Sequence, residues 1–151
     1  MSAGRKKVAL VSSIGGHLAE LLELVPVLDT IPADPIWILN DDSPVLAPDI
    51  PAWLITHAER DLHVFTNVLE LAAIFARERP DAMLSLGAGP AVPAALIARL
   101  AGIPILYIEP SSAVSTPTLT GRIMRWLARE RWAQWPEVAK KLRARFDGAL
   151  L

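Results

Sequence analysis

The sequence predicts an α/β domain in which helices cover both faces of a parallel sheet. Short apolar runs, which have the length of buried strands, alternate along the chain with longer stretches that carry apolar residues every three or four positions. This alternation is typical of a doubly wound, Rossmann-like parallel sheet. A chain of 151 residues, 52% of them hydrophobic, is long enough to bury one core. We therefore expect a single domain over residues 1–151.

The individual elements follow from the same patterns. An apolar run at residues 8–11 predicts the first strand, and a helical pattern at 17–28 follows it until the proline-rich segment 31–35. Four further strands are predicted at 36–39, 53–55, 82–86 and 103–108, and two long helices at 61–79 and 90–101. The C-terminal quarter predicts a short basic helix opening at 120–122, a strand at 131–135 and a last helix from 136 to 145.

Composition excludes several classes of function. The net charge of −1 gives no global field that favours nucleic acid, and the absence of cysteine excludes disulfides and thiolate chemistry. The histidines, His17, His57 and His63, lack the close spacing of a metal motif, so we expect no structural metal. No apolar stretch reaches the roughly 20 residues that cross a bilayer, and the run after Arg5 is too short for a signal peptide.

The most informative motif directly follows the first strand. Ser12 and Ser13 lead through Ile14 to Gly15, Gly16 and His17, where the helical pattern begins. Glycines let the backbone approach a ligand closely, and the amides of a helix start attract anions. The sequence therefore favours a phosphate-facing loop, although a tight turn with a histidine cap would produce the same residues.

Two other predicted strands end in loops of similar character. Gly87 and Gly89 follow the strand at 82–86, and Glu109 leads to Ser111 and Ser112 after the strand at 103–108. In a doubly wound sheet the ligand crevice lies beyond the carboxyl ends of the strands. We therefore expect all three loops to meet at one edge, although each also has an ordinary turn composition.

The C-terminal quarter is basic. Between Arg122 and Arg145 it carries eight lysines or arginines against Glu130 and Glu137. Such a segment suits an anionic lipid, a phosphate or an acidic partner, and a solvated helix face is the alternative. Tryptophans beside arginines, as at Trp126, favour an edge that faces a membrane or a partner, or else core residues with charged neighbours.

Five motifs, in this order, resemble one known family. They are Ser13-Ile14-Gly15-Gly16-His17, Gly87-Ala88-Gly89-Pro90, Tyr107-Ile108-Glu109, Leu119-Thr120-Gly121-Arg122 and Gln134-Trp135-Pro136-Glu137. Across nearly the whole chain they resemble the membrane-recruiting subunit of the two-chain UDP-N-acetylglucosamine transferase of lipid-linked oligosaccharide synthesis. Its bacterial relatives are accessory subunits in capsule and exopolysaccharide assembly. The pattern is similar, more distantly, to the N-terminal half of the transferase that completes the lipid-linked peptidoglycan precursor.

The resemblance implies the N-terminal half of a GT-B glycosyltransferase divided between two polypeptides. This half would face a polyprenyl-(pyro)phosphate-linked acceptor, while a donor-binding partner chain would hold most of the UDP-sugar, with no other cofactor. We expect a heterodimer that is inactive without the partner, located in the cytoplasm at the inner face of the plasma membrane. Eukaryotic members carry an N-terminal anchor, whereas here the first strand begins almost at once, so the expected membrane contact is peripheral.

The resemblance also implies roles for single residues. His17 and Glu109 are the candidate catalytic residues: His17 for proton transfer, and Glu109 as a second proton acceptor or an orienting carboxylate. A binding or capping role for His17, and the ordering of its own loop by Glu109, are the alternatives. Arg60 resembles a family arginine or belongs to an exposed charge cluster. The candidate acceptor- or phosphate-binding residues are Ser13, Gly15, Gly16, Gly87, Gly89, Ser112, Gly121 and Arg122. The candidate partner or membrane contacts are Arg125, Trp126, Gln134 and Trp135.

Two other classes of function stay open. One is a self-sufficient nucleotide-binding domain, for which Asp41 and Asp42 offer an acid after the second strand, although the full Gly-x-Gly-x-x-Gly fingerprint is missing. The other is a non-catalytic scaffold that recruits a partner to membranes through its basic C-terminal quarter.

Overall fold

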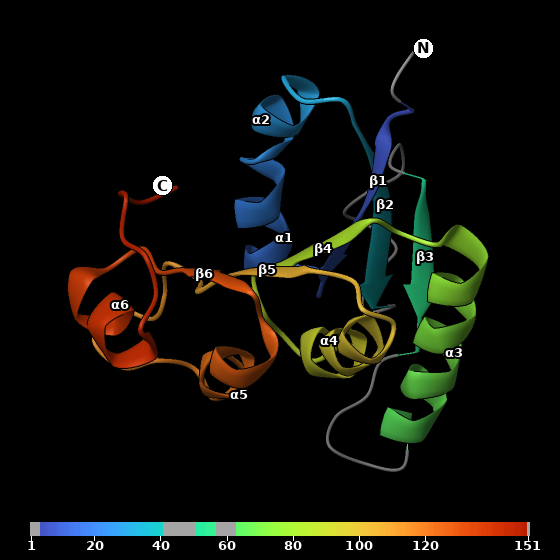
Figure 1. The fold of residues 1–151 in the computed structure, drawn as a ribbon. Helices are drawn as coiled ribbons and strands as arrows, with labels where there is room; N and C mark the ends of the chain where they lie inside the picture. The colour runs from blue at the N-terminus through green and yellow to red at the C-terminus, as the bar shows by residue number, and fades with distance from the viewer. Residues whose placement is uncertain (1–3, 41–50, 57–62, 151) are drawn as a thin grey trace.

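A computed structural model describes residues 4–40, 51–56 and 63–150 of the chain (Figure 1). Asp41, Asp42, His57 and Arg60, to which the sequence analysis assigns candidate roles, lie outside the described residues. The strands are β1 (Lys6–Ser12), β2 (Ala33–Asn40), β3 (Ala52–Ile55), β4 (Ala82–Ser85), β5 (Ile105–Ile108) and β6 (Glu130–Trp132). The helices are α1 (Gly16–Leu22), α2 (Val25–Asp29), α3 (His63–Glu78), α4 (Ala91–Leu100), α5 (Leu119–Leu127) and α6 (Pro136–Leu142).

The six strands form one sheet in the order β3-β2-β1-β4-β5-β6, and every neighbouring pair is parallel. The strand order reverses between β1 and β4, because β2 and β3 extend the sheet on one side of β1 while β4, β5 and β6 extend it on the other. This is the doubly wound arrangement of Rossmann-like folds. The fold class predicted from the sequence is confirmed.

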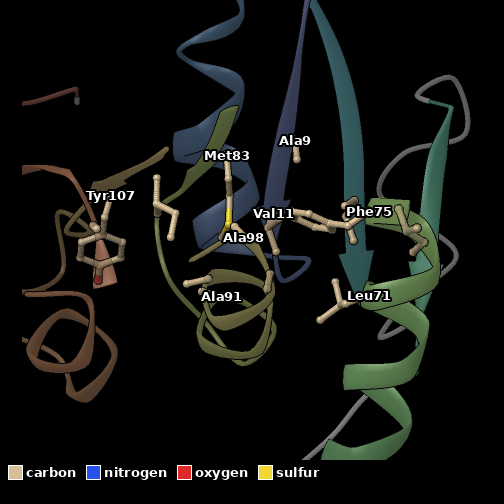
Figure 2. Packing of buried hydrophobic residues seen from close by; sticks show 14 of the residues in the cluster. Ala9, Val11, Leu71, Phe75, Met83, Ala91, Ala98 and Tyr107 are labelled. Carbon is tan, nitrogen blue, oxygen red and sulfur yellow. The ribbon is translucent and has the colours of Figure 1, made fainter. Parts of the chain in front are cut away.

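Side chains alternate between the two faces of the sheet, as the strand period of two requires. Ala9 and Val11 of β1 pack against α3, α4 and α5, together with Met83 of β4 and Tyr107 of β5 (Figure 2). The intervening residues, such as Leu10 of β1, point to the opposite face. There they pack with Leu18 and Leu21 of α1 and Trp37 of β2. The two cores together sandwich the sheet between helices, and both faces are apolar for that reason.

Helix α4 lies close to the sheet because it presents alanines to it. Ala91, Ala94, Ala95 and Ala98 follow a spacing of three and four residues, and all four are fully buried. A stripe of such small side chains covers one face of the helix. It brings the start of α4 directly behind the loop that follows β4.

The predicted helix at 17–28 is wrong in one respect, because the structure has two short helices there. Helix α1 ends at Leu22, and α2 starts at Val25 with Pro26 in its first turn. Proline has no N–H to donate to the carbonyl four residues earlier, and its ring collides with that carbonyl. For Pro26 this carbonyl belongs to Leu22, so one continuous helix cannot form.

The predicted last helix is also shorter than expected. Helix α6 ends at Leu142, because Arg143 takes a left-handed conformation with a φ of 51°. The chain then returns to the sheet, where the N–H of Arg145 bonds to the carbonyl of Arg131 at 2.8 Å. The strand predicted at 131–135 is correspondingly shortened to β6. The other predicted elements are confirmed with boundaries shifted by a few residues.

Candidate functional site

Three loops converge at the carboxyl edge of the sheet, where the strand order reverses. They follow β1, β4 and β5, which lie side by side in the sheet. A crevice beyond the strand ends at such a switch point is the usual ligand site of this fold. The structure therefore brings together the three loops that the sequence analysis expected to meet, and we call this place the crevice.

The first loop leaves its backbone open toward the crevice. Gly15 precedes α1 with a φ of +118°, a conformation that side chains rarely adopt, and no atom lies within 4 Å of a Cβ added at Gly15 or Gly16. Since Gly15 has no side chain, it cannot cap the first turn of α1. The loop is fixed at its base, where the N–H of Ile14 donates to Oδ1 of buried Asn40 at 3.0 Å.

The loop after β4 is tied to the first loop by one buried hydroxyl. Ser85 Oγ donates to the carbonyl of Val11 at 2.7 Å and accepts from the N–H of Gly87 at 3.1 Å. Gly87 and Ala88 both have positive φ, 108° and 72°. Two such residues in succession make a tight turn, and strain at a non-glycine residue such as Ala88 is found mostly where surrounding structure enforces it. Gly89 follows, exposed, before α4 begins.

Glu109 is fully buried at the end of β5. Its Oε2 accepts from the Tyr107 hydroxyl and its Oε1 from the N–H of Thr118, both at 2.5 Å. Thr118 is the N-cap of α5, so the carboxylate lies at the positive end of that helix, which stabilises a negative charge. Burial raises the pKa of Tyr107 well above its ordinary value of 10.0, and the Glu109 carboxylate raises it further.

A second buried carboxylate, which the sequence analysis missed, belongs to Glu20 of α1. It accepts from Ser111 Oγ at 2.6 Å, from the N–H of Ser111 at 3.1 and 3.2 Å, and from Gln134 Nε2 at 2.8 Å. Gln134 Nε2 also donates to the carbonyl of Glu109 at 3.2 Å. Glu20 follows His17 by three residues, about one helical turn, and this spacing is the signal that could have found it.

His17 lies at the start of α1, half-buried. Its Nδ1 is shielded from solvent and has no hydrogen-bond partner among the residues that the structure describes. The ring therefore keeps a nitrogen that no described protein group occupies. Within the described ranges no group of three or more histidine, cysteine, aspartate or glutamate side chains is placed to hold a metal.

The remaining predicted site residues fall into two groups. Ser13 and Ser112 lie in the first and third loops, and Arg122 is exposed in the first turn of α5. Arg125 and Trp126 lie further along α5, where Trp126 is 77% exposed. Trp135 is 39% exposed and donates from Nε1 to the carbonyl of Ser111 at 2.7 Å.

Two predicted roles need correction. Gln134 was expected to contact a partner or the membrane, but it is only 4% exposed and its amide is used inside the molecule. Gly121 was expected to bind phosphate, but it is buried against Glu109, and a Cβ added there would lie 2.8 Å from the carboxyl carbon. Glu109 has no exposed surface either, which fits the ordering of its own loop; its catalytic role stays a prediction.

Comparison with known proteins supports the resemblance read from the motifs. No family model matches the chain. The chain is 26% identical to the human UDP-N-acetylglucosamine transferase subunit ALG14, over 89% of this chain and 77% of that protein. It is 27% identical to the rat subunit of the same name, over 87% of this chain and 76% of that protein. The predicted similarity to this transferase subunit is confirmed.

Solved structures confirm the fold. MurG from Acinetobacter baumannii matches with a TM-score of 0.75 at 19% identity, over 88% of this chain and 43% of MurG. The UDP-GlcNAc 2-epimerase of Methanocaldococcus jannaschii also matches with a TM-score of 0.75, at 12% identity, over 91% of this chain and 42% of the epimerase. The chain thus spans less than half the length of these proteins and has the fold of part of them.

Substitution of Gly121 tests the contact between α5 and Glu109. We expect Gly121→Ala to lower the free energy of unfolding by about 1–3 kcal/mol, because the new methyl group overpacks against a carboxylate that two hydrogen bonds hold in place. Denaturant unfolding measures the change. Gly16→Ala is the matched control, since nothing lies within 4 Å of its Cβ. Equal stability of the two glycine variants would contradict the packing.

The raised pKa of Tyr107 predicts a loss of stability in alkali. A pKa that is higher in the folded than in the unfolded state contributes stability that is fully present below the unfolded value, 10.0, and is lost as pH rises above it. We expect the free energy of unfolding to fall more steeply above pH 10.0 for the wild type than for Tyr107→Phe. Because Tyr107 is the only tyrosine, phenolate absorbance reports its ionisation directly. If the free energy of unfolding changes with pH in parallel for the two proteins, the ionisation of Tyr107 is not the cause of the loss.

Proposed function

We propose that this chain is the accessory, acceptor-side subunit of a two-chain glycosyltransferase. In this proposal the assembled pair transfers N-acetylglucosamine from UDP-N-acetylglucosamine to a polyprenyl-(pyro)phosphate-linked acceptor. The similarity to ALG14 across 89% of the chain carries the proposal, because that protein is named as a subunit of a UDP-N-acetylglucosamine transferase. The donor-binding half is accordingly assigned to a second chain.

The crevice has the features that an acceptor phosphate requires. The open backbone at Gly15 and Gly16 allows close approach, and hydroxyl groups at Ser13 and Ser112 are available as donors from two of the loops. Arg122 supplies a cation on the first turn of α5, whose N-cap Thr118 is bonded to Glu109. These groups support binding of the phosphate end of an acceptor, and the polyprenyl chain would then leave toward the outer face of α5.

His17 is the proposed proton acceptor or phosphate ligand at this crevice. Sugar transfer needs a base near the acceptor oxygen, and a general base accelerates such reactions about 10²–10⁴-fold. The imidazole is half-buried at the glycine loop, and its Nδ1 lacks a hydrogen-bond partner among the described residues. Because this nitrogen is shielded from solvent, the ring has to turn before a ligand can reach it. In this proposal Glu109 is a positioning residue, because it holds the start of α5 and the third loop in place.

A second candidate function, recruitment to a membrane surface, is favoured by the outer face of α5. Leu119, Ile123 and Trp126 recur every four and three residues, so they share one face of the helix, and they are 61%, 36% and 77% exposed. Arg122 and Arg125 flank this stripe. Exposed apolar residues with arginines beside them are typical of helices that lie in the membrane interface. No helix within the described ranges is long and apolar enough to cross a bilayer.

Reconstitution with a donor-binding chain tests the first proposal. The probe is UDP-N-acetylglucosamine with a polyprenyl-pyrophosphate-linked N-acetylglucosamine acceptor. We expect product only when this chain and the partner are combined, and His17→Ala should lower turnover of the assembled pair by about 10²–10⁴-fold while co-purification is unchanged. Full turnover by this chain alone would overturn the proposal.

Two variants of α1 serve as controls for that experiment. His17→Gln keeps a hydrogen-bonding side chain but can neither accept nor release a proton near neutral pH. Recovery of KM without kcat therefore indicates proton transfer, and recovery of both indicates binding. Leu22→Ala changes an exposed residue at the other end of α1 and should leave turnover unchanged. If Leu22→Ala lowers turnover as much as His17→Ala does, the effect of His17→Ala is explained by damage to helix α1.

Vesicle binding tests the outer face of α5. Trp126→Ser should weaken binding to vesicles of mixed neutral and anionic lipid about tenfold, because it removes the most exposed apolar side chain of the stripe from contact with the lipid. Val27→Ser is the matched control, since Val27 is 56% exposed on α2, which packs with the opposite face of the sheet. Sedimentation with the vesicles measures both. An equal loss in the two variants argues against a membrane role for α5.

A further inference from the structure

We propose that the arginine-lined pocket at the amino edge of the sheet binds a phosphoryl group. The pocket lies beside the start of β5 and the ends of α4 and α5, and segment 102–105 forms part of its wall. Arg99, Arg125, Arg129 and Arg131 line it together with Trp126. It goes beyond the proposed function, because the crevice with the glycine loops lies at the opposite edge of the sheet.

The two sites are separated by the depth of the sheet. Strand β5 has four residues, from Ile105 at the pocket to Ile108 before Glu109. At roughly 3.3 Å per residue, the strand places about 10–13 Å between the two edges. A ligand in the arginine pocket therefore does not share atoms with a ligand at Gly15 or Gly87.

The arginines of this pocket come from two parts of the chain, the end of α4 and the stretch from the end of α5 into β6. Arg99 is in the last turn of α4, Arg125 in the last turn of α5, and Arg129 and Arg131 flank the start of β6. The pocket has a volume of about 390 Å³, which lies in the range of small-ligand sites. Guanidinium groups match the oxygens of phosphates and carboxylates through pairs of N–H donors, and several arginines together suit the larger charge of a phosphoryl group.

Three of the four arginines keep their N–H donors free for a ligand. Arg131 is the exception, since its NH1 donates to the carbonyl of Ala128 at 2.9 Å and its NH2 to the carbonyl of Arg143 at 3.3 Å. Arg99 and Arg129 have no side-chain hydrogen bond or ion pair within the described part of the chain, and the Arg125 guanidinium lies over the Trp126 ring, 5.5 Å from its centroid. Arg131 Nε is shielded from solvent and likewise lacks a partner among the described residues.

The electrostatic balance of the pocket favours an anion. Four guanidinium charges are opposed by the carbonyl ends of α4 and α5, which carry about −0.5 charge each. About three positive charges therefore remain. Glu130 lies between Arg129 and Arg131 in the sequence, but it does not line the pocket and forms no ion pair with any described residue. A phosphoryl group, with one or two negative charges and several acceptor oxygens, complements this arrangement.

Titration of the full chain with inorganic pyrophosphate, followed by two-dimensional NMR, tests the pocket. The indole N–H signal of Trp126, assigned through Trp126→Phe, should move in the wild type. Arg99→Ala and Arg129→Ala should each weaken binding about tenfold, as expected for loss of a charge-assisted hydrogen bond. Neither residue has a role in the crevice, and both side chains are exposed, so the fold should be retained.

Lys140→Ala is the matched control, because it removes one positive charge from an exposed position on α6 outside the pocket. A loss of affinity in this variant equal to that in Arg99→Ala would show a general charge effect and overturn the site. Absence of any wild-type shift with pyrophosphate, together with unchanged vesicle binding in Arg99→Ala and Arg129→Ala, would also overturn it.

A vesicle arm distinguishes the two sources of a phosphoryl group. If the ligand is a lipid headgroup, Arg99→Ala and Arg129→Ala weaken binding to vesicles of phosphatidylglycerol in phosphatidylcholine, and pyrophosphate competes with the vesicles. If the ligand is a soluble phosphate ester, both variants lose affinity for pyrophosphate and keep vesicle binding. Either result supports the phosphoryl site. The apolar stripe of α5 is intact in both variants, so the effect is separable from that of Trp126→Ser.

Discussion

Two buried carboxylates at the carboxyl edge of the sheet constrain the rest of the structure. Burying a carboxylate without hydrogen-bond partners costs several kcal/mol of folding free energy, so a buried carboxylate must be hydrogen-bonded. Glu20 and Glu109 form no ion pair within the described ranges, and neutral donors satisfy them instead: Ser111 and Gln134 for Glu20, Tyr107 and Thr118 for Glu109. These donors come from β5, the loop after it, the segment that follows β6 and the start of α5. Each of these segments is therefore held in position by its hydrogen bond to a buried carboxylate.

The same carboxylates connect α1 to the loop after β5. Glu20 lies one helical turn from His17, so the bonds that hold Glu20 to Ser111 also set the distance of α1 from the loop after β5. Gln134 bonds to both Glu20 and the carbonyl of Glu109, and thereby joins the two groups into one network. Buried networks of this kind depend on every member being satisfied. This network places α1 against the loop after β5, while the Ser85 hydroxyl ties the loop after β4 to β1.

The sequence was sufficient for the fold, because strand and helix periods are local properties. The strand at Ala9 and Val11 and the helix of buried alanines around Ala94 were recognisable from neighbouring residues alone. The hydrogen-bond network of Glu20 and Glu109 was not recognisable in this way, because it depends on distant residues. Ser111 and Gln134 lie 91 and 114 positions from Glu20. For the same reason the resemblance, which implied a partner or membrane contact for Gln134, did not show that its amide is used inside the molecule. The break at Pro26 was missed although its cause is local, since the apolar spacing continues through the proline.

Helix α5 relates the two edges of the sheet to each other. Its first turn is held by Glu109 at the crevice, and its last turn carries Arg125 to the arginine pocket at the opposite edge. Nine residues at about 1.5 Å each give a length of roughly 13 Å, which matches the depth of a four-residue strand. The exposed stripe from Leu119 to Trp126 runs along this same length. A membrane surface that contacts the stripe therefore reaches both edges at once, and a phosphoryl group held at the arginine pocket would fix the orientation in which the crevice meets a lipid-linked acceptor.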